Sequence, residues 1–362
     1  MMAKRWIISG GGTGGHIYPA IAIAQAIQRR DAQSKILFVG AEGRMEMEKV
    51  PQAGYEIIGL PIAGIQRKLD WRNFLLPFKV IRSLWRARQV VKSFQPDAVV
   101  GVGGYASGPL LWMASRAGVP TYIQEQNSFA GLTNKWLSQK ATKIFVAYPN
   151  MQRFFPQQKI TVTGNPIRFE WSQDRFSKSI ALSHFGLREG KPTLLMVGGS
   201  LGARAMNQVM EMHLEELLNK GYQVIWQTGK NYVPQVKWAN QEGLWVGAFI
   251  TEMHQAYAAA DAIISRAGAM SISELSLIGK PTAFVPSPYV SEDHQTHNAM
   301  ALVNDGAALL IKESELASKW QATVDELLSE GGDNERRCQK LQLWAKPQAA
   351  DEIVDIMYND IK

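Results

Sequence analysis

The chain of 362 residues has 39 Lys and Arg against 32 Asp and Glu, a net charge of +7, and 46% hydrophobic residues. This length predicts two domains, and this composition excludes disorder, collagen and coiled coil as overall classes. The single cysteine, Cys338, excludes an intramolecular disulfide and a cysteine-rich zinc site. The sequence contains no run of about 18 apolar residues that would predict a membrane-spanning helix. No apolar stretch of secretory length precedes the first glycines, so we expect the chain to stay in the cytoplasm.

Short apolar runs alternate with amphipathic stretches along the chain, which is typical of an α/β fold with buried parallel strands. In the first half the sequence predicts a helix from about Pro19 and strands at 4–9, 35–39, 98–102, 121–124 and 143–147. After a turn at residues 164–166 the pattern restarts, with strands at 193–197, 223–227, 244–246, 262–264, 282–285 and 308–311. Helices are expected at 204–218 and at 349–361. Two strand–glycine loop–helix units about 190 residues apart therefore predict two Rossmann-like domains.

Three glycine-rich loops follow predicted strands, at residues 10–15, 103–109 and 198–204. Backbone N–H groups in such loops can bind phosphates. The first loop matches the dinucleotide pattern G-x-G-x-x-G, but Glu42, the nearest acidic candidate for a ribose contact, lies 27 residues beyond Gly15. The glycine pattern keeps a nicotinamide-dependent oxidoreductase as an alternative. Three such loops in two domains instead favour a protein with two phosphate-bearing ligands.

Basic residues are concentrated in the first half of the chain. Residues 1–150 have a net charge of +11 and residues 151–362 a net charge of −4, so we expect an anionic membrane, nucleic acid or phosphorylated substrate as a partner. A helix expected at 77–94 has a predicted core stripe and, nearly opposite, a second apolar stripe with basic neighbours. The second stripe consists of Phe78, Ile81 and Trp85, and its basic neighbours are Lys79, Arg82 and Arg86. This pattern indicates an interfacial membrane site; burial of both stripes is the alternative, and without a recognised RNA or DNA motif we expect no nucleic-acid partner.

Seven segments resemble, in family order, the MurG family of UDP-N-acetylglucosamine transferases of peptidoglycan synthesis. They are residues 10–20, 103–109, 125–138, 163–168, 198–204, 259–275 and 293–299. The resemblance implies the GT-B architecture, an α/β fold of two Rossmann-like parallel-sheet domains that face each other across a cleft. It implies an acceptor- and membrane-binding domain at 1–164 and a UDP-GlcNAc-binding domain at 165–346. A C-terminal helix at 347–362 is expected to pack back on the first domain.

The reaction implied by the resemblance is an inverting transfer of GlcNAc from UDP-GlcNAc to the 4-hydroxyl of undecaprenyl-diphospho-MurNAc-pentapeptide (lipid I). The products are the β-1,4-linked disaccharide of lipid II and UDP, and neither a cofactor nor a metal is expected. We expect a peripheral protein at the cytoplasmic face of the cell membrane, with cell-wall synthesis and division proteins as possible partners. The alternatives are a transferase with another lipid acceptor, a Rossmann oxidoreductase and a non-catalytic nucleotide-sugar sensor.

Most candidate site residues lie in the matched segments. The resemblance implies that the UDP-GlcNAc site comprises Thr13, Gly14, Gly15, Asn127, Arg168, Ser200, Ile250, Ala269, Met270, Ser271, Ile272, Ser273, Glu274 and Gln295. In this set Glu274 is expected to accept both ribose hydroxyls, and the backbone of Ile250 to read the uracil edge. A helix expected to start at Ala269 would direct its first N–H groups at a nucleotide phosphate. The loop residues expected at the acceptor diphosphate are Gly103, Gly104, Tyr105 and Ser107.

The transfer needs a base near the acceptor hydroxyl, and two residues are candidates. His16 follows the first glycine loop, and the reference pKa of histidine, about 6.5, suits a base at neutral pH. The alternative is that His16 only caps the loop. Glu125 opens another matched segment, and the sequence does not choose between the two. The chain departs from the family pattern at Leu201, where Gln is frequent, and at Gln124, where His is frequent.

Overall fold

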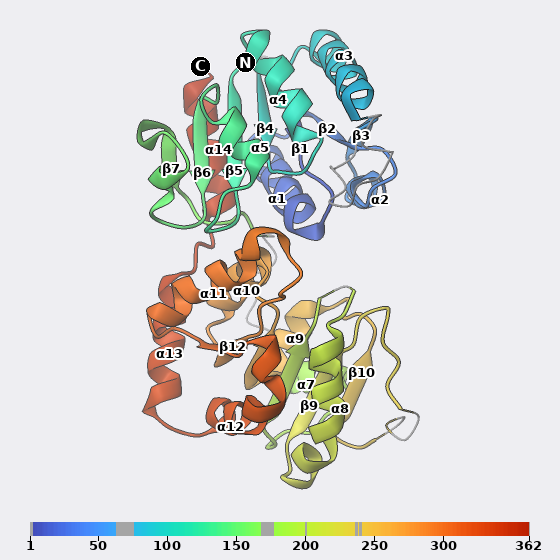
Figure 1. Ribbon diagram of the computed structural model, residues 1–362, viewed down its shortest axis with the longest axis vertical. Helices are drawn as coiled ribbons and strands as arrows, with labels where there is room; N and C mark the ends of the chain where they lie inside the picture. Colours follow the sequence, from blue (N-terminus) through green and yellow to red (C-terminus); the bar gives the residue numbers. More distant parts are fainter. Residues whose placement is uncertain are drawn as a thin grey trace. The chain divides into compact units, whose positions relative to one another are not determined.

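The computed structural model describes residues 3–62, 76–167, 177–199, 201–235, 238 and 241–361. The chain divides into two compact units, one of Met1–Phe169 with Lys346–Lys362 and one of Glu170–Ala345. Each unit contains a parallel sheet covered by helices (Figure 1). The predicted α/β class with two Rossmann-like sheets is therefore confirmed.

In the N-terminal unit, the described residues form a seven-stranded parallel sheet in the order β3-β2-β1-β4-β5-β6-β7. The strands are β1 (Arg5–Ser9), β2 (Lys35–Ala41), β3 (Glu56–Leu60), β4 (Ala98–Gly101), β5 (Thr121–Glu125), β6 (Lys143–Val146) and β7 (Ile160–Val162). The sequence did not predict β3, because Glu56 and Gly59 interrupt its apolar residues. The central strands are buried on both faces, which explains why their residues are continuously apolar.

The helices of this unit are α1 (Gly14–Arg30), α2 (Glu46–Gln52), α3 (Leu76–Phe94), α4 (Ser107–Arg116), α5 (Leu132–Leu137) and α14 (Ala349–Asp360). The prediction that the first helix starts near Pro19 is wrong, since α1 starts at Gly14 and contains Pro19. The Thr13 carbonyl accepts the N–H groups of His16 and Ile17 and closes the first turn. Pro19 is the sixth residue of α1, so the helix lacks the backbone bond that an N–H at this position would donate to the Gly15 carbonyl.

The last helix packs on the first one although more than 300 residues separate them. α14 contacts α1, and its residues Ile353 and Met357 are fully buried with Trp6 in one core on that face of the sheet. Tyr358 lies against Trp6, with 5.1 Å between the ring centroids. Figure 1 shows α14 in red within the N-terminal unit, partly behind the strands in this view. The end of the chain is therefore part of the N-terminal core.

In the C-terminal unit, a second sheet repeats the same topology, in the order β10-β9-β8-β11-β12-β13. Its strands are β8 (Thr193–Val197), β9 (Gln223–Gln227), β10 (Leu244–Gly247), β11 (Ala262–Ser265), β12 (Thr282–Phe284) and β13 (Leu309–Leu310). Its helices are α7 (Lys178–His184), α8 (Arg204–Asn219), α9 (Met253–Ala259), α10 (Ala269–Ile278), α11 (His294–Asn304), α12 (Leu316–Leu328) and α13 (Gly332–Leu343). A core with Met206, Trp226 and Trp320 joins β8 and β9 to α8 and α12. Of the helices within the described residues, none has the length and apolar character needed to cross a bilayer.

Candidate active site

The strand order in each sheet reverses direction beside its first strand, at the position where open α/β sheets bind ligands. In the N-terminal sheet this is between β1 and β4, and Ser9 at the end of β1 is aligned with Gly101 at the end of β4. In the C-terminal sheet it is between β8 and β11, where Val197 is aligned with Ser265. All three glycine-rich loops follow these strand ends. Each unit therefore presents a candidate half-site at the carboxyl edge of its own sheet.

The two glycine loops of the N-terminal unit pack directly on each other. Gly104 has a φ of +88°, and a Cβ there would lie 2.5 Å from the carbonyl oxygen of Gly11. Gly103 has a φ of +101°, and a Cβ there would lie 2.6 Å from Cδ2 of His16. Both positions thus require glycine for conformation and for space. The close packing sets the expected acceptor loop against the expected base.

His16 lies in the first turn of α1 and is half-buried. Its Nδ1 is 3.0 Å from the carbonyl oxygen of Gly11 and 3.4 Å from Oγ1 of Thr13. A carbonyl oxygen can only accept, so the shorter contact is a hydrogen bond when Nδ1 carries the proton. Nε2 then carries the lone pair that a general base uses.

Glu125 ends β5 and is buried with both carboxylate oxygens hydrogen-bonded. Oε1 accepts from the backbone N–H and the side-chain Nδ2 of Asn127, at 3.1 and 3.2 Å. Oε2 accepts from the Gly131 N–H at 3.0 Å and from Nδ2 of Asn134 at 2.9 Å. Four donors stabilise the charged carboxylate and hold the loop that carries Asn127. Both Glu125 oxygens are therefore engaged in contacts that hold this loop.

One residue at this edge was missed by sequence reasoning. Glu46 starts α2, and its carboxylate accepts the N–H of Gly12 at 2.9 Å and that of Ala41 at 3.0 Å. A buried carboxylate bonded to the first glycine loop disfavours a diphosphate there, because the two anions repel each other. Glu42, the residue considered for a nicotinamide ribose, instead forms an ion pair with Arg86 at 2.7 Å. Both contacts argue against the oxidoreductase alternative.

The remaining candidates of this unit lie around the same two loops. Thr13 is the N-cap of α1 and, with Gly14 and Gly15, stands at the exposed end of the first loop. In the second loop Tyr105 is exposed, whereas the Ser107 hydroxyl is buried and donates to the Gly104 carbonyl at 2.7 Å. The Ser107 side chain thus shapes the loop.

In the C-terminal unit, the glycine loop after β8 packs against the loop after β9. A Cβ at Gly202, whose φ is +79°, would lie 2.1 Å from the Thr228 carbonyl oxygen. The Gly199 carbonyl accepts from Nε2 of Gln227 at 3.0 Å, and Nδ2 of Asn207 donates to Thr228 at 2.8 Å. These bonds fix the loop on both sides. Ser200 in this loop and Arg168, both expected at the diphosphate, lie outside the described residues.

The segment expected to bind the nucleotide forms α10, which begins at Ala269 as predicted. Its first turn contains Met270 and Ser271, which are partly exposed, and Ile272, which is buried. The Ser273 hydroxyl donates to the Ala269 carbonyl at 3.0 Å, and Tyr257 of α9 donates to Oε2 of Glu274 at 3.3 Å. The side chain of Ile250 is buried, as the core-packing alternative requires.

Lys280 and Arg266 form hydrogen bonds that connect the segments next to α10. Burial lowers the pKa of Lys280 to about 8, and its ammonium group donates to the carbonyls of Tyr257 and Ala258 at the end of α9. Arg266 follows β11, donates to the carbonyls of Val285 and Pro286, and forms an ion pair with Glu313. The loops after β11 and β12 are thereby held together.

Gln295 lies in the first turn of α11 and is partly exposed. Its Oε1 accepts the N–H of Ser287 at 2.8 Å, so its amide NH2 is the group that can donate to a sugar hydroxyl. Glu292 and Asp293 before it have φ values of +56° and +49°. Two successive non-glycine residues in this region carry backbone strain, which is often associated with binding sites.

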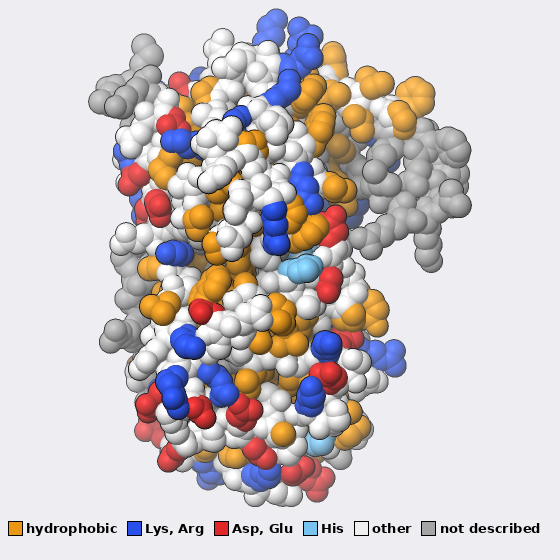
Figure 2. Space-filling view, turned by 60° about the vertical axis from the view of Figure 1, so that its left-hand side comes forward, with side chains coloured by type: hydrophobic (Ala, Val, Ile, Leu, Met, Phe, Trp, Pro, Cys, Tyr) orange, Lys and Arg blue, Asp and Glu red, His pale blue; other side chains and the backbone are white. Residues whose placement is uncertain are grey.

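The predicted amphipathic helix is α3. Its core stripe includes Ala87 and Val91, which are buried in a further core of the N-terminal unit that also contains Ile7 of β1. Phe78, Ile81 and Trp85 are 70%, 65% and 62% exposed, so burial of both stripes is excluded. Figure 2 shows hydrophobic and basic side chains exposed on the surface of the N-terminal unit. We call Phe78, Ile81 and Trp85 the apolar stripe of α3.

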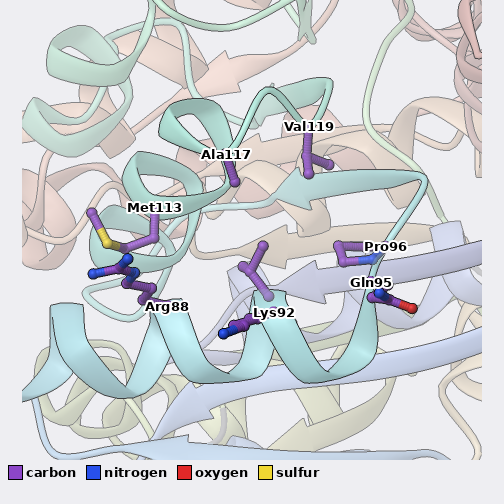
Figure 3. Close-up of a pocket in the computed structure, with 8 residues that line it drawn as sticks. Arg88, Lys92, Gln95, Pro96, Met113, Ala117 and Val119 are labelled. Atoms are coloured by element: carbon purple, nitrogen blue, oxygen red, sulfur yellow. The ribbon is translucent and has the colours of Figure 1, made fainter.

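A hollow of about 430 Å³ lies between α3 and α4 (Figure 3). Its lining comprises Arg88, Val91, Lys92, Gln95, Pro96, Met113, Ala117 and Val119. Gln95, Pro96 and Val119 precede β4 and β5, so this hollow is at the amino edge of the sheet, opposite the glycine loops. It contains none of the expected site residues. Across the described ranges, no group of three or more His, Cys, Asp or Glu side chains is arranged to hold a metal ion.

Family comparisons match both units. The N-terminal domain of glycosyltransferase family 28 matches residues 6–146, and the C-terminal domain of that family matches residues 193–353. The solved MurG structure from Acinetobacter baumannii is 30% identical to this chain, covers 98% of it and 99% of its own chain, and superposes with a TM-score of 0.76.

Two curated relatives have the same printed name, UDP-N-acetylglucosamine--N-acetylmuramyl-(pentapeptide) pyrophosphoryl-undecaprenol N-acetylglucosamine transferase. The protein from Cytophaga hutchinsonii is 52% identical over 99% of this chain and 97% of its own length. The protein from Porphyromonas gingivalis is 52% identical over 97% of this chain and 94% of its own length. The similarity therefore extends over both units.

Proposed function

The chain belongs to glycosyltransferase family 28, among the MurG transferases, and we propose that it transfers GlcNAc from UDP-GlcNAc to lipid I, forming lipid II and UDP in peptidoglycan synthesis. The observation that carries this function is the 52% identity to a named transferase over 99% of the chain. The contacts of Glu46 and Glu42 support it over an oxidoreductase.

We propose His16 as the base of a single displacement. Nε2 takes the proton of the acceptor 4-hydroxyl while the hydroxyl oxygen attacks the anomeric carbon. The bond from that carbon to the diphosphate breaks, UDP leaves, and the sugar inverts to a β-linkage. The hydrogen bond from Nδ1 to the Gly11 carbonyl supports this role, because it leaves the lone pair on Nε2.

We assign the donor to the C-terminal half-site. The N–H groups at the start of α10 and in the loop after β8 are suited to bind the diphosphate and to stabilise the charge on departing UDP. Arg168 and Ser200 are further candidates for that contact. Glu274 would accept the ribose hydroxyls, Ile250 would read uracil through its backbone, and Gln295 would donate to the sugar.

The acceptor belongs, in this proposal, to the N-terminal half-site. The loop of Gly103, Gly104 and Tyr105 would bind its diphosphate, with Ser107 holding the loop in shape. Thr13, Gly14, Gly15 and Asn127 would contact the donor sugar. The apolar stripe of α3 would enter the membrane interface, which makes the protein peripheral at the cytoplasmic face.

UDP release tests the reaction directly. We expect the protein to release UDP from UDP-GlcNAc only when the prenyl-diphospho-muramyl-pentapeptide acceptor is present, also in EDTA. His16→Gln should lower turnover by about 10²- to 10⁴-fold, as expected for the loss of a general base. The matched control is His184→Gln, at an exposed position in α7. Donor binding without acceptor-dependent release would refute this acceptor, and near-normal turnover of His16→Gln would refute the base.

A further inference from the structure

Glu46 is a carboxylate in a closed environment at the edge of the N-terminal sheet. It is 1% exposed, and its two oxygens accept the N–H groups of Ala41 and Gly12. A buried charge is costly unless it is hydrogen-bonded, so these two bonds and the start of α2 stabilise it there. The carboxylate thereby connects the end of β2 to the first glycine loop.

Two glycines leave the space that this side chain occupies. A Cβ at Gly11 would lie 2.1 Å from Oε1 of Glu46, and a Cβ at Gly40 would lie 2.5 Å from its Cγ. The first distance is far below van der Waals contact, so a larger residue at Gly11 would displace the carboxylate. The loop and the end of β2 are therefore shaped around Glu46.

The bond from Gly12 has a direct connection to His16. The N–H of Gly12 and the carbonyl of Gly11 belong to one peptide group, and they point in opposite directions in a trans peptide. The N–H donates to Oε2 of Glu46 at 2.9 Å, and the carbonyl is 3.0 Å from Nδ1 of His16. Carboxylate, peptide and imidazole thus form one hydrogen-bonded chain.

We propose that Glu46 is a positioning residue that acts on His16 through the Gly11–Gly12 peptide. The negative charge polarises the peptide and strengthens its carbonyl as an acceptor, because hydrogen bonds in a chain reinforce one another. The carbonyl then holds the proton of the neutral imidazole on Nδ1, which orients the ring and leaves the lone pair on Nε2. This inference rests on the proposed function, in which Nε2 accepts the proton of the acceptor hydroxyl.

Several titratable side chains lie on the elements around His16 at the carboxyl edge of the N-terminal sheet. Tyr18 lies on α1 two residues after His16, and Tyr105 follows the glycines that pack against Gly11 and His16. Glu125 is engaged by the loop of Asn127 and Gly131. Glu46 is the charged group that is hydrogen-bonded to the same peptide as His16.

The first test is the tautomer of His16 in the wild-type protein. We expect the ¹⁵N spectrum of the histidine-labelled protein at neutral pH to show His16 protonated on Nδ1, with its signal assigned by its loss in His16→Gln. A wild-type His16 protonated on Nε2 would overturn the proposal. This measurement needs neither catalysis nor a folded Glu46 variant.

The second test is Glu46→Gln, which keeps the size of the side chain and removes its charge. We expect the Nε2-protonated form to appear and kcat to fall about 10- to 100-fold, as for other partners that orient a functional histidine, with much less change in KM for UDP-GlcNAc. The acidic limb of the kcat–pH profile should move to lower pH, because loss of the negative charge makes His16 a weaker base.

The matched control is Asp97→Asn, which removes another carboxylate that accepts a backbone N–H, that of Arg5, at the opposite edge of the sheet. It should leave the His16 tautomer and kcat unchanged. If Glu46→Gln lowers kcat without changing the tautomer or the pH profile, Glu46 is only structural and the proposal fails. If the tautomer depends on Glu46 but the wild type releases no UDP with acceptor, the proposed function fails and the link to His16 stands.

Discussion

Replacing the apolar stripe of α3 is expected to weaken binding to anionic vesicles by about two to four orders of magnitude. Full burial of a large apolar side chain contributes about 1.5–3 kcal/mol. Phe78, Ile81 and Trp85 are about two-thirds exposed, so transfer into the interface contributes about 1–2 kcal/mol each and about 3–6 kcal/mol together. Since about 1.4 kcal/mol corresponds to a tenfold change in affinity, the triple change to serine should lower partitioning by about 10²- to 10⁴-fold.

Sedimentation with vesicles of neutral and anionic lipid measures this loss. The matched control changes Ile180, Met212 and Leu343 to serine, since these are 65%, 71% and 77% exposed but lie in the C-terminal unit. The control should bind like the wild type. Equal losses in the two triple variants, or no loss from the α3 variant, would refute the membrane assignment of this stripe.

The basic neighbours of the stripe are expected to contribute unequally. A basic residue at an anionic surface contributes about 1 kcal/mol. Arg86 already pairs with Glu42, whereas no such ion pair of Lys79 or Arg82 occurs within the described residues. Changing Lys79 or Arg82 to Gln should therefore weaken binding and its salt dependence more than Arg86→Gln does.

Three further predictions concern the donor site, the loop contact and the C-terminal helix. Glu274→Gln should weaken UDP-GlcNAc binding about 10- to 100-fold in calorimetry, because charged hydrogen bonds to the ribose would be lost; unchanged affinity would exclude the ribose contact. Gly104→Ala should lower the stability to urea by more than Gly118→Ala does. Gly118 has a similar φ of +77° but open space around it, so it is the control for the backbone strain. Equal effects would show that the contact of Gly104 with Gly11 is unimportant. Met357→Ala should cost about 2–5 kcal/mol in the free energy of unfolding, against less than about 0.5 kcal/mol for the exposed Met212→Ala. A small loss at Met357 would contradict the packing of α14 on α1.

The site shows how far sequence reasoning reaches. The glycine loops, His16 and the start of α10 could be placed because they follow apolar strands in a fixed local order. The choice between His16 and Glu125 could not be made, because it depends on which donors surround each group. Glu125 meets Asn127, Gly131 and Asn134 only once the loop after β5 has folded back.

Other differences have the same origin. Local rules put the start of the first helix at Pro19, but the turn from Thr13 to Ile17 is closed within the loop and moves the start to Gly14. Glu42 and Arg86 lie 44 residues apart and become partners because the fold brings Arg86 on α3 next to the residue that follows β2. No local pattern in the sequence indicates that contact.

Two parallel-sheet units, the glycine loops at strand ends and the second apolar stripe of α3 could be predicted from the sequence, because hydrophobic periodicity and glycine conformation act over a few residues. That this stripe is exposed became known only from the folded chain. The hydrogen-bond partners of the polar groups, in contrast, depend on the tertiary structure. A hydrogen bond requires atoms about 3 Å apart, and the strand order brings such atoms together from distant parts of the chain. Glu46 reaches the peptide beside His16 in this way, from 30 residues further along the chain.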